Sequence, residues 1–342
     1  MATFLNIDYQ TWWLLATAII LVTYGILDGF DLGAGAWHLF LKKEDHRQLA
    51  MKVIAPIWDG NEVFLLIGGG ALFAGFPEVY ATLFSAMYVP FMLFLLFLIT
   101  RGISIEFRNK EQFAWWKKSW DIGYGIASAV LPVLLGVVIA NVLQGMPLDS
   151  HFEFTGSWLS FLNPYALFIG IMALSFTMVH GAAYLLIKTE GELHDRIHFL
   201  LKKILPIFTM LFTISVIWSI MKLSHGFPRR TALYVMLIVI IAVIGGIIWS
   251  IRKQKFHLTF IGSSFAMLLA GVLALVKHFP MMLPSTIDPI NNSLTIYNGC
   301  GSEKSLETML IIAAIGVPLV IVYVVFVYRI FWGKVNKEDS GY

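Results

Sequence analysis

The stretch TYGILDGFDLGAGAW, residues 23–37, decides the fold, because it combines an apolar membrane-type segment with two carboxylates. Asp28 and Asp31 are three residues apart, so a helix places both on one face. A charge near the centre of a bilayer costs about 2.5–3.5 kcal/mol on insertion scales, so these acids should face other helices rather than lipid. Four glycines in the stretch allow neighbouring helices to approach closely. The sequence therefore predicts a helix bundle with a polar interior face on this segment.

The composition of the whole chain indicates an all-α, polytopic membrane protein. Of its 342 residues, 58% are hydrophobic and 13% are charged, which is unlike a soluble globular domain. The single cysteine, Cys300, excludes an internal disulfide and a multi-cysteine metal site. The net charge of +3 arises in short loops between apolar runs, so we expect no nucleic-acid partner. Residues 12–27 read as part of a mature span rather than a removed signal.

Hydropathy in windows of about 19 residues predicts nine membrane-spanning helices in one integral membrane domain covering 1–342. The predicted spans are 11–40, 54–75, 80–100, 121–144, 164–187, 200–221, 231–250, 258–278 and 308–331. Helices one to four then occupy about 11–144, helices five to eight occupy about 164–278, and an outer loop at 279–307 precedes helix nine. The first span is long enough either to project past the bilayer or to break at its glycine-rich part.

The distribution of basic residues predicts the orientation. Loops that follow the odd-numbered spans contain 19 Lys and Arg residues, and the opposite side has four, with Lys277 near a span end. Cytoplasmic loops carry the excess of positive charge, so we expect the N-terminus outside and the C-terminus in the cytoplasm.

Six polar side chains fall in the predicted cytoplasmic third of four consecutive helices. They are Asp28, Asp31, Asp59, Glu62, Arg101 and Asp121. Consecutive membrane helices joined by short loops are usually neighbours, so we expect one polar cluster. One interpretation is a proton-conducting or proton-storing cluster that opens to the cytoplasm. The other is a network of ion pairs that only fixes the bundle. The excess of acids over the single arginine gives weight to protonation chemistry, because all of them cannot stay ionised cheaply.

His180 lies in the middle of the predicted fifth span. It has two interpretations, a haem or metal ligand and a hydrogen-bonded core histidine. We favour the second, because a haem between helices needs a second ligand at matching depth and the sequence offers none. We therefore expect no metal site and no catalytic residue in this chain.

Long stretches with specific motifs run from end to end of the chain. They include WWLLATAIILVTYGILDGFDLGAG (12–35), IAPIWDGNEVFLLIGGGALFAGFPEVYATLFSAMY (54–88), WDIGYGIASAVLPVLLGVVIANVLQGMPL (120–148), HGAAYLLIKTEGELHDR (180–196) and VPLVIVYVVFVYRIFWGKV (317–335). Together they resemble subunit II of the cytochrome bd-type quinol oxidases.

The resemblance implies a partner, a reaction and a fold. The chain would pair with a homologous subunit I that holds haems b and d, and the complex would oxidise quinol and reduce dioxygen to water. Its place would be the prokaryotic cytoplasmic membrane, with lipid and an optional small single-span subunit as further partners. The implied fold has two four-helix bundles plus one peripheral helix.

The resemblance also bears on single residues. Asp59 and Asp31 match positions that the family ties to proton entry, and Arg101 and Asp121 match further polar positions. Glu62 stands where we expect a glutamine in the family, and it could extend the chain of acids. His180 stands where the family often has a polar amide, which does not make it a haem ligand.

Two alternatives stay open at this point. A proton-coupled secondary transporter should have a substrate cavity and an inverted repeat near mid-membrane. The sequence shows neither of these features. A purely structural partner of subunit I cannot be separated from a proton-conducting one by the residues alone.

Overall fold

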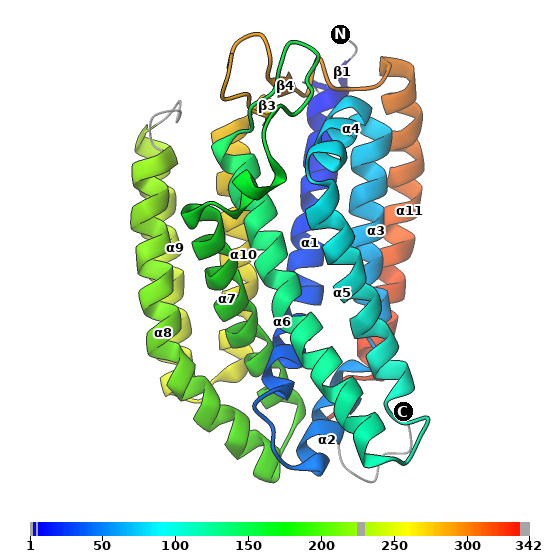
Figure 1. Ribbon diagram of the computed structural model, residues 1–342, viewed down its shortest axis with the longest axis vertical. Helices are drawn as coiled ribbons and strands as arrows, with labels where there is room; N and C mark the ends of the chain where they lie inside the picture. Colours follow the sequence, from blue (N-terminus) through cyan, green and yellow to red (C-terminus); the bar gives the residue numbers. More distant parts are fainter. Residues whose placement is uncertain (1–2, 5, 224–229, 336–342) are drawn as a thin grey trace.

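The apolar runs form long helices, since a helix satisfies its backbone polar groups internally even in lipid. The computed structural model describes residues 3–4, 6–223 and 230–335, and Figure 1 shows most of its helices aligned with one long axis. The helices are α1 (Tyr9–His38), α2 (Glu44–Ile54), α3 (Trp58–Gly75), α4 (Pro77–Ala86), α5 (Tyr88–Phe107), α6 (Ala114–Gln144), α7 (Pro164–Lys188), α8 (Gly191–Leu223), α9 (Arg230–Arg252), α10 (Phe256–His278) and α11 (Glu303–Ile330), with a 3₁₀ helix η1 (Trp158–Leu162). Two short antiparallel pairs complete the structure: β1 (Thr3–Phe4) with β2 (Ile7–Asp8), and β3 (Met281–Leu283) with β4 (Leu294–Thr295).

Side-chain caps fix where several helices begin. The Asp8 carboxylate accepts a hydrogen bond from the Thr11 amide at 2.6 Å at the start of α1. Asn163 accepts one from the Ala166 amide at 2.9 Å before α7, whose first residue is a proline. Ser302 caps α11 in the same way. Each cap satisfies an amide that has no partner inside its own helix.

The predicted spans agree with the structure in most places, and we describe the three clearest differences. Seven helices of the described residues are long and apolar enough to cross a membrane, or eight if α3 and α4 form one span. The prediction of a third span at 80–100 is wrong in its start: α3 and α4 are bent by 119°, and the continuous helix α5 begins at Tyr88. Pro77 begins α4, a position at which proline starts a helix readily.

The other two differences lie at the opposite end of the molecule from α4. The amphipathic helix α2 was not predicted, because hydropathy windows find only long apolar runs. The helix α8 begins at Gly191, well before the predicted 200. The helix α1 runs unbroken over Tyr9–His38, so the glycine-rich part does not interrupt it.

The helix α1 lies at the centre of the packing and contacts α3, α6, α7 and α10, whereas α11 lies at one edge against α1 and α3 (Figure 1). Backbone meets backbone where α1 crosses α7: a Cβ added at Gly33 would lie 1.8 Å from the Thr177 carbonyl oxygen. The expectation of close helix approach is therefore confirmed at Gly33. Gly25 has no such neighbour within 4 Å.

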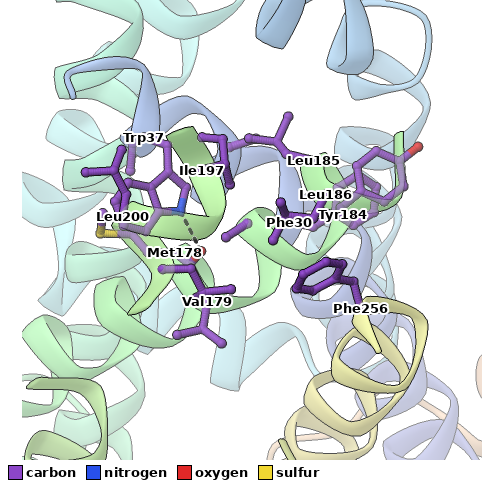
Figure 2. Packing of buried hydrophobic residues seen from close by; sticks show 14 of the residues in the cluster. Phe30, Trp37, Met178, Val179, Tyr184, Leu185, Leu186, Ile197, Leu200 and Phe256 are labelled. Atoms are coloured by element: carbon purple, nitrogen blue, oxygen red, sulfur yellow. Dashed lines mark hydrogen bonds between the residues drawn. The ribbon is translucent and has the colours of Figure 1, made fainter. Parts of the chain in front are cut away.

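The largest group of buried apolar side chains surrounds this crossing. In Figure 2, Phe30 and Trp37 of α1 lie among side chains of α7 and α8, and the Trp37 indole donates to the Met178 carbonyl at 2.7 Å. The hydrogen bond satisfies the indole donor in an otherwise apolar core.

The loops separate into two groups at the two ends of the bundle (Figure 1). The helix α2 and the connections from α5 to α6, from α7 to α8 and from α9 to α10 lie at one end, together with the carboxyl end of α11. The amino terminus, α4 and the loops that contain β3 and β4 lie at the other end. The basic loops thus share one end, and its assignment to the cytoplasm stays a prediction.

Candidate functional site

Three carboxylates of the first helices converge on one arginine, in a group that we call the acid cluster (Asp28, Asp31, Asn61, Glu62 and Arg101). Arg101, near the carboxyl end of α5, places its Nη2 atom 3.1 Å from Asp28 Oδ1 and 3.9 Å from Asp31 Oδ2. Its Nη1 atom donates to Glu62 of α3. The indole of Trp58 lies 5.9 Å from the guanidinium and closes one side. The structure therefore brings together four of the six predicted residues.

The acid cluster is almost fully buried, and its acids outnumber its one cation. The side chains of Asp28, Asp31 and Arg101 are fully buried, and that of Glu62 is 17% exposed. Ionisation of every acid would leave two negative charges uncompensated, which burial makes costly. Because its acids cannot all stay ionised, a group of this composition can take up and release protons.

Asn61 and Tyr328 belong to the same network and were missed by sequence reasoning. The Asn61 amide donates to Asp31 Oδ2 at 2.7 Å, and the Tyr328 hydroxyl donates to Asn61 Oδ1 at 2.9 Å. Asn61 is adjacent to Glu62 in the WDGNE motif, and that position could have drawn attention to it. Tyr328 comes from α11, far away in the chain, and nothing in the sequence connects it to the acids.

Asp59 is not part of the buried network, although we expected it there. Its side chain is exposed on α3, and the inward position is held by Asn61 instead. A helix turns by about 100° per residue, so positions 59 and 61 point in nearly opposite directions. Asp59 still acts electrostatically on Glu62, the partly exposed member of the acid cluster.

Asp121 lies in a separate group, so the expectation of one cluster is wrong. This second group, the Asp121 cluster, consists of Asp121, His38, Arg47, Arg108 and Glu44. His38 Nε2 and Arg108 Nε both lie 2.6 Å from Asp121 Oδ1, and Arg47 Nη1 lies 3.3 Å from Oδ2. Its partners His38 and Arg108 each come seven residues after Asp31 and Arg101, a displacement of about 10 Å along the helices towards the carboxyl end of α1 and α2.

The ion pairs of Arg108 connect α5, α6 and α2. Arg108 follows the last residue of α5, and besides Asp121 it donates to Glu44 Oε1 at 2.6 Å. Asp121 and Glu44 hold the pKa of the Arg108 guanidinium above its ordinary value, although burial acts to lower it. The Asp121 cluster therefore fastens the helix ends at one end of the bundle. Tyr124, one turn along α6, is buried and packs its ring edge-on against His38 at 5.2 Å.

His180 has a partner at each ring nitrogen. Nδ1 lies 2.7 Å from the Ser263 hydroxyl and Nε2 lies 3.0 Å from the Ile26 carbonyl oxygen. The ring is fully buried and stacks on Phe260 at 4.5 Å. The interpretation of His180 as a hydrogen-bonded core histidine is confirmed. Iron ligation by either nitrogen would require one of these hydrogen bonds to break.

Comparison with known proteins shows which family the chain resembles. The sequence model described as "Cytochrome bd terminal oxidase subunit II" matches residues 9–331. Cytochrome bd-I ubiquinol oxidase subunit 2 of Escherichia coli K12 is 31% identical, over 97% of each chain. Cytochrome bd ubiquinol oxidase subunit 2 of Bacillus subtilis 168 is 30% identical, over 96% of this chain and 97% of that protein. A chain in the structure of bd oxidase from Geobacillus thermodenitrificans has the same fold, with a TM-score of 0.78 over 94% of this chain and 98% of that chain at 19% identity.

Proposed function

Because this chain belongs to the cytochrome bd terminal oxidase subunit II family, we propose that its acid cluster stores and passes protons for the reaction of the complex. The chain is a subunit of a respiratory quinol oxidase in the bacterial membrane, and its partner is subunit I. In the reaction, two quinols reduce one dioxygen to two waters, which consumes four protons at the site of oxygen reduction. We infer that these protons come from the cytoplasm.

The observation that carries this proposal is the gathering of Asp28, Asp31 and Glu62 around the single guanidinium of Arg101. A network that only fixed the helices would be cheaper with balanced charges, because uncompensated buried charge is expensive. Asp59 is exposed on α3, Glu62 is partly exposed, and Asp28 and Asp31 are buried. These carboxylates therefore form a series that leads from the surface of α3 into the acid cluster. The contacts of Asp121 join the ends of neighbouring helices, so we assign Asp121 a structural role.

We infer that haems b and d are held by subunit I rather than by this chain. The buried His180 has both nitrogens in hydrogen bonds. Iron ligation by His180 would break one of these bonds, which supports the inference that this chain acts in support of subunit I and in proton supply.

We further propose nine spans as two four-helix bundles, over about 11–144 and 164–278, with α11 as the peripheral helix after the 279–307 loop. The position of α11 at the edge of the molecule supports this arrangement (Figure 1). The 19 basic residues of one set of loops support an external N-terminus and a cytoplasmic C-terminus. Membrane lipid is the expected neighbour of the exposed apolar side chains, and a small single-span subunit remains an optional partner.

The family disfavours a proton-coupled transporter, since the relatives are oxidase subunits. The remaining alternative is a purely structural partner of subunit I. An experiment on Asp31 distinguishes that alternative from a proton-conducting subunit. Asp31→Asn keeps the shape and still accepts from Asn61, but it removes a titrating group. We expect the variant complex to assemble with its haems and to lose at least about tenfold in oxygen consumption per haem d, a loss typical of a missing proton-transfer group.

Two further variants sharpen the test. Asp59→Asn reports on the surface position, and we expect it to slow turnover while haem content stays normal. Asp195→Asn removes an exposed carboxylate at the same end of the bundle and serves as the matched control. Wild-type turnover in both Asp31→Asn and Asp59→Asn would refute the proton role. Loss of haem, with normal turnover in the complex that survives, would identify a structural network.

A further inference from the structure

The last helix, α11, is held to the bundle by little apolar burial. It packs against α1 and α3, and in its most apolar window of 18 residues no residue is buried inside the chain. Polar contacts at the carboxyl end of α11 therefore contribute much of what holds this helix in place. Two of them involve buried partners from other helices.

The first is the ammonium group of Lys188, the last residue of α7. The residue is 6% exposed, and its Nζ atom donates to the carbonyl oxygens of Phe331 at 2.5 Å, Trp332 at 2.9 Å and Gly333 at 3.4 Å. These carbonyls belong to the three residues that directly follow α11. A cation at this end is also favoured by the helix dipole. The backbone adds one more contact, because the Val335 amide donates to the Lys188 carbonyl at 2.9 Å.

The second contact is made by Tyr328, one turn before these carbonyls. Its hydroxyl donates to Asn61 Oδ1 at 2.9 Å, and Asn61 is 1% exposed. An amide side chain accepts through its oxygen and donates through its nitrogen. A donor at Oδ1 therefore fixes which way the amide points, and the nitrogen is then directed at Asp31 Oδ2 at 2.7 Å.

We propose that Tyr328 is a positioning residue for the acid cluster: its hydroxyl orients Asn61 towards Asp31, and Lys188 holds Tyr328 in place by binding the carboxyl end of α11. The effect on Asp31 follows from geometry alone, whereas the effect on turnover rests on the proposed proton function. Lys188 thus acts on a carboxylate that it does not touch, through one helix end and two side chains.

Infrared difference spectroscopy of the purified complex across a pH step tests the positioning role directly. The carboxyl band of Asp31 is the band that Asp31→Asn removes. We expect Tyr328→Phe to shift this band and to lower oxygen consumption per haem d about two- to tenfold, as for the loss of one neutral hydrogen bond. Tyr323→Phe, on the same helix with a half-exposed side chain, is the matched control and should leave band and turnover unchanged.

Variants of Lys188 provide a second test of the positioning role. This test remains decisive if the Tyr328→Phe complex does not assemble. Lys188→Gln should shift the same band in the same direction, and Lys188→Arg, which keeps a cationic donor, should restore it. Lys334→Gln removes an exposed ion pair with Glu190 and serves as the control. A merely structural role for Lys188 would lower the yield of complex and leave the band in place.

The outcomes separate this inference from the proposed function. An unshifted Asp31 band in assembled Tyr328→Phe, or in Lys188→Gln if the tyrosine variant does not assemble, overturns the positioning role. Normal turnover in Asp31→Asn together with a shifted band in Tyr328→Phe overturns the proton function and leaves the positioning role intact.

Discussion

Replacing Arg101 by glutamine removes the cation that three carboxylates share, and we expect the largest loss of stability in the acid cluster. Nη2 lies 3.1 Å from Asp28 Oδ1 and 3.9 Å from Asp31 Oδ2. With an effective dielectric constant of about 20, these separations correspond to attractions of about 5 and about 4 kcal/mol. Much of this gain offsets the cost of desolvation. Breaking a buried pair by removing one partner then costs about 3–5 kcal/mol, since it strands the other charge.

The assay is the fraction of haem that the purified complex retains after heating. Unfolding of large membrane complexes is seldom reversible, so the rate of haem loss is the practical measure of stability. Arg101→Gln should lose haem at lower temperature than the wild type. Arg329→Gln, which removes an exposed arginine of α11, should not. Adding Asp28→Asn to Arg101→Gln removes one stranded charge and should recover part of the loss, so that the two changes are not additive. An Arg101→Gln complex as heat-stable as the wild type would refute the reasoning.

Three shorter predictions concern other parts of the chain. Gly33→Ala should destabilise the complex by about 1–3 kcal/mol or prevent assembly, because the new methyl group meets the backbone of α7, whereas Gly25→Ala should be tolerated in the same heating assay. His180→Gln should leave haem content unchanged, and an assembled complex lacking one haem would contradict this. Burial raises the pKa of the Cys300 thiol, so a membrane-impermeant maleimide should label it in intact cells faster at pH 9 than at pH 7. Labelling only in inverted vesicles would reverse the proposed orientation.

Part of the acid cluster could be predicted from the sequence because the relevant information is local. Asp28 and Asp31 share a helix face by spacing, and Glu62 and Arg101 fall at the same depth on the next spans. The rotation of α3 about its own axis could not be predicted, because that helix is apolar nearly all round and its hydrophobic pattern marks no inward face. Asn61 rather than Asp59 therefore turned out to point inward.

Assignment of six residues to one third of the membrane was also too coarse to predict which groups lie side by side. Asp121 was predicted in the same cytoplasmic third, yet it contacts His38 and Arg108, which lie about two helical turns beyond Asp31 and Arg101. Tyr328 reaches Asn61 across 267 positions of sequence, a contact that only the packing of α11 creates. The break before α4 was marked by Pro77, but in an apolar segment a proline does not by itself distinguish a kink from a new helix.

The distribution of the acid cluster along the chain has a consequence for biosynthesis. All of its charged members lie within the first 107 residues, so the carboxylates meet their guanidinium as soon as α5 enters the membrane. The ribosome has 227 further residues to add between Arg101 and Tyr328, which takes about 10–45 s at bacterial elongation rates. During that interval Arg101 already has its carboxylate partners, while Asn61 still lacks its tyrosine donor. The final helix to emerge therefore completes a hydrogen-bond network that the earliest helices begin.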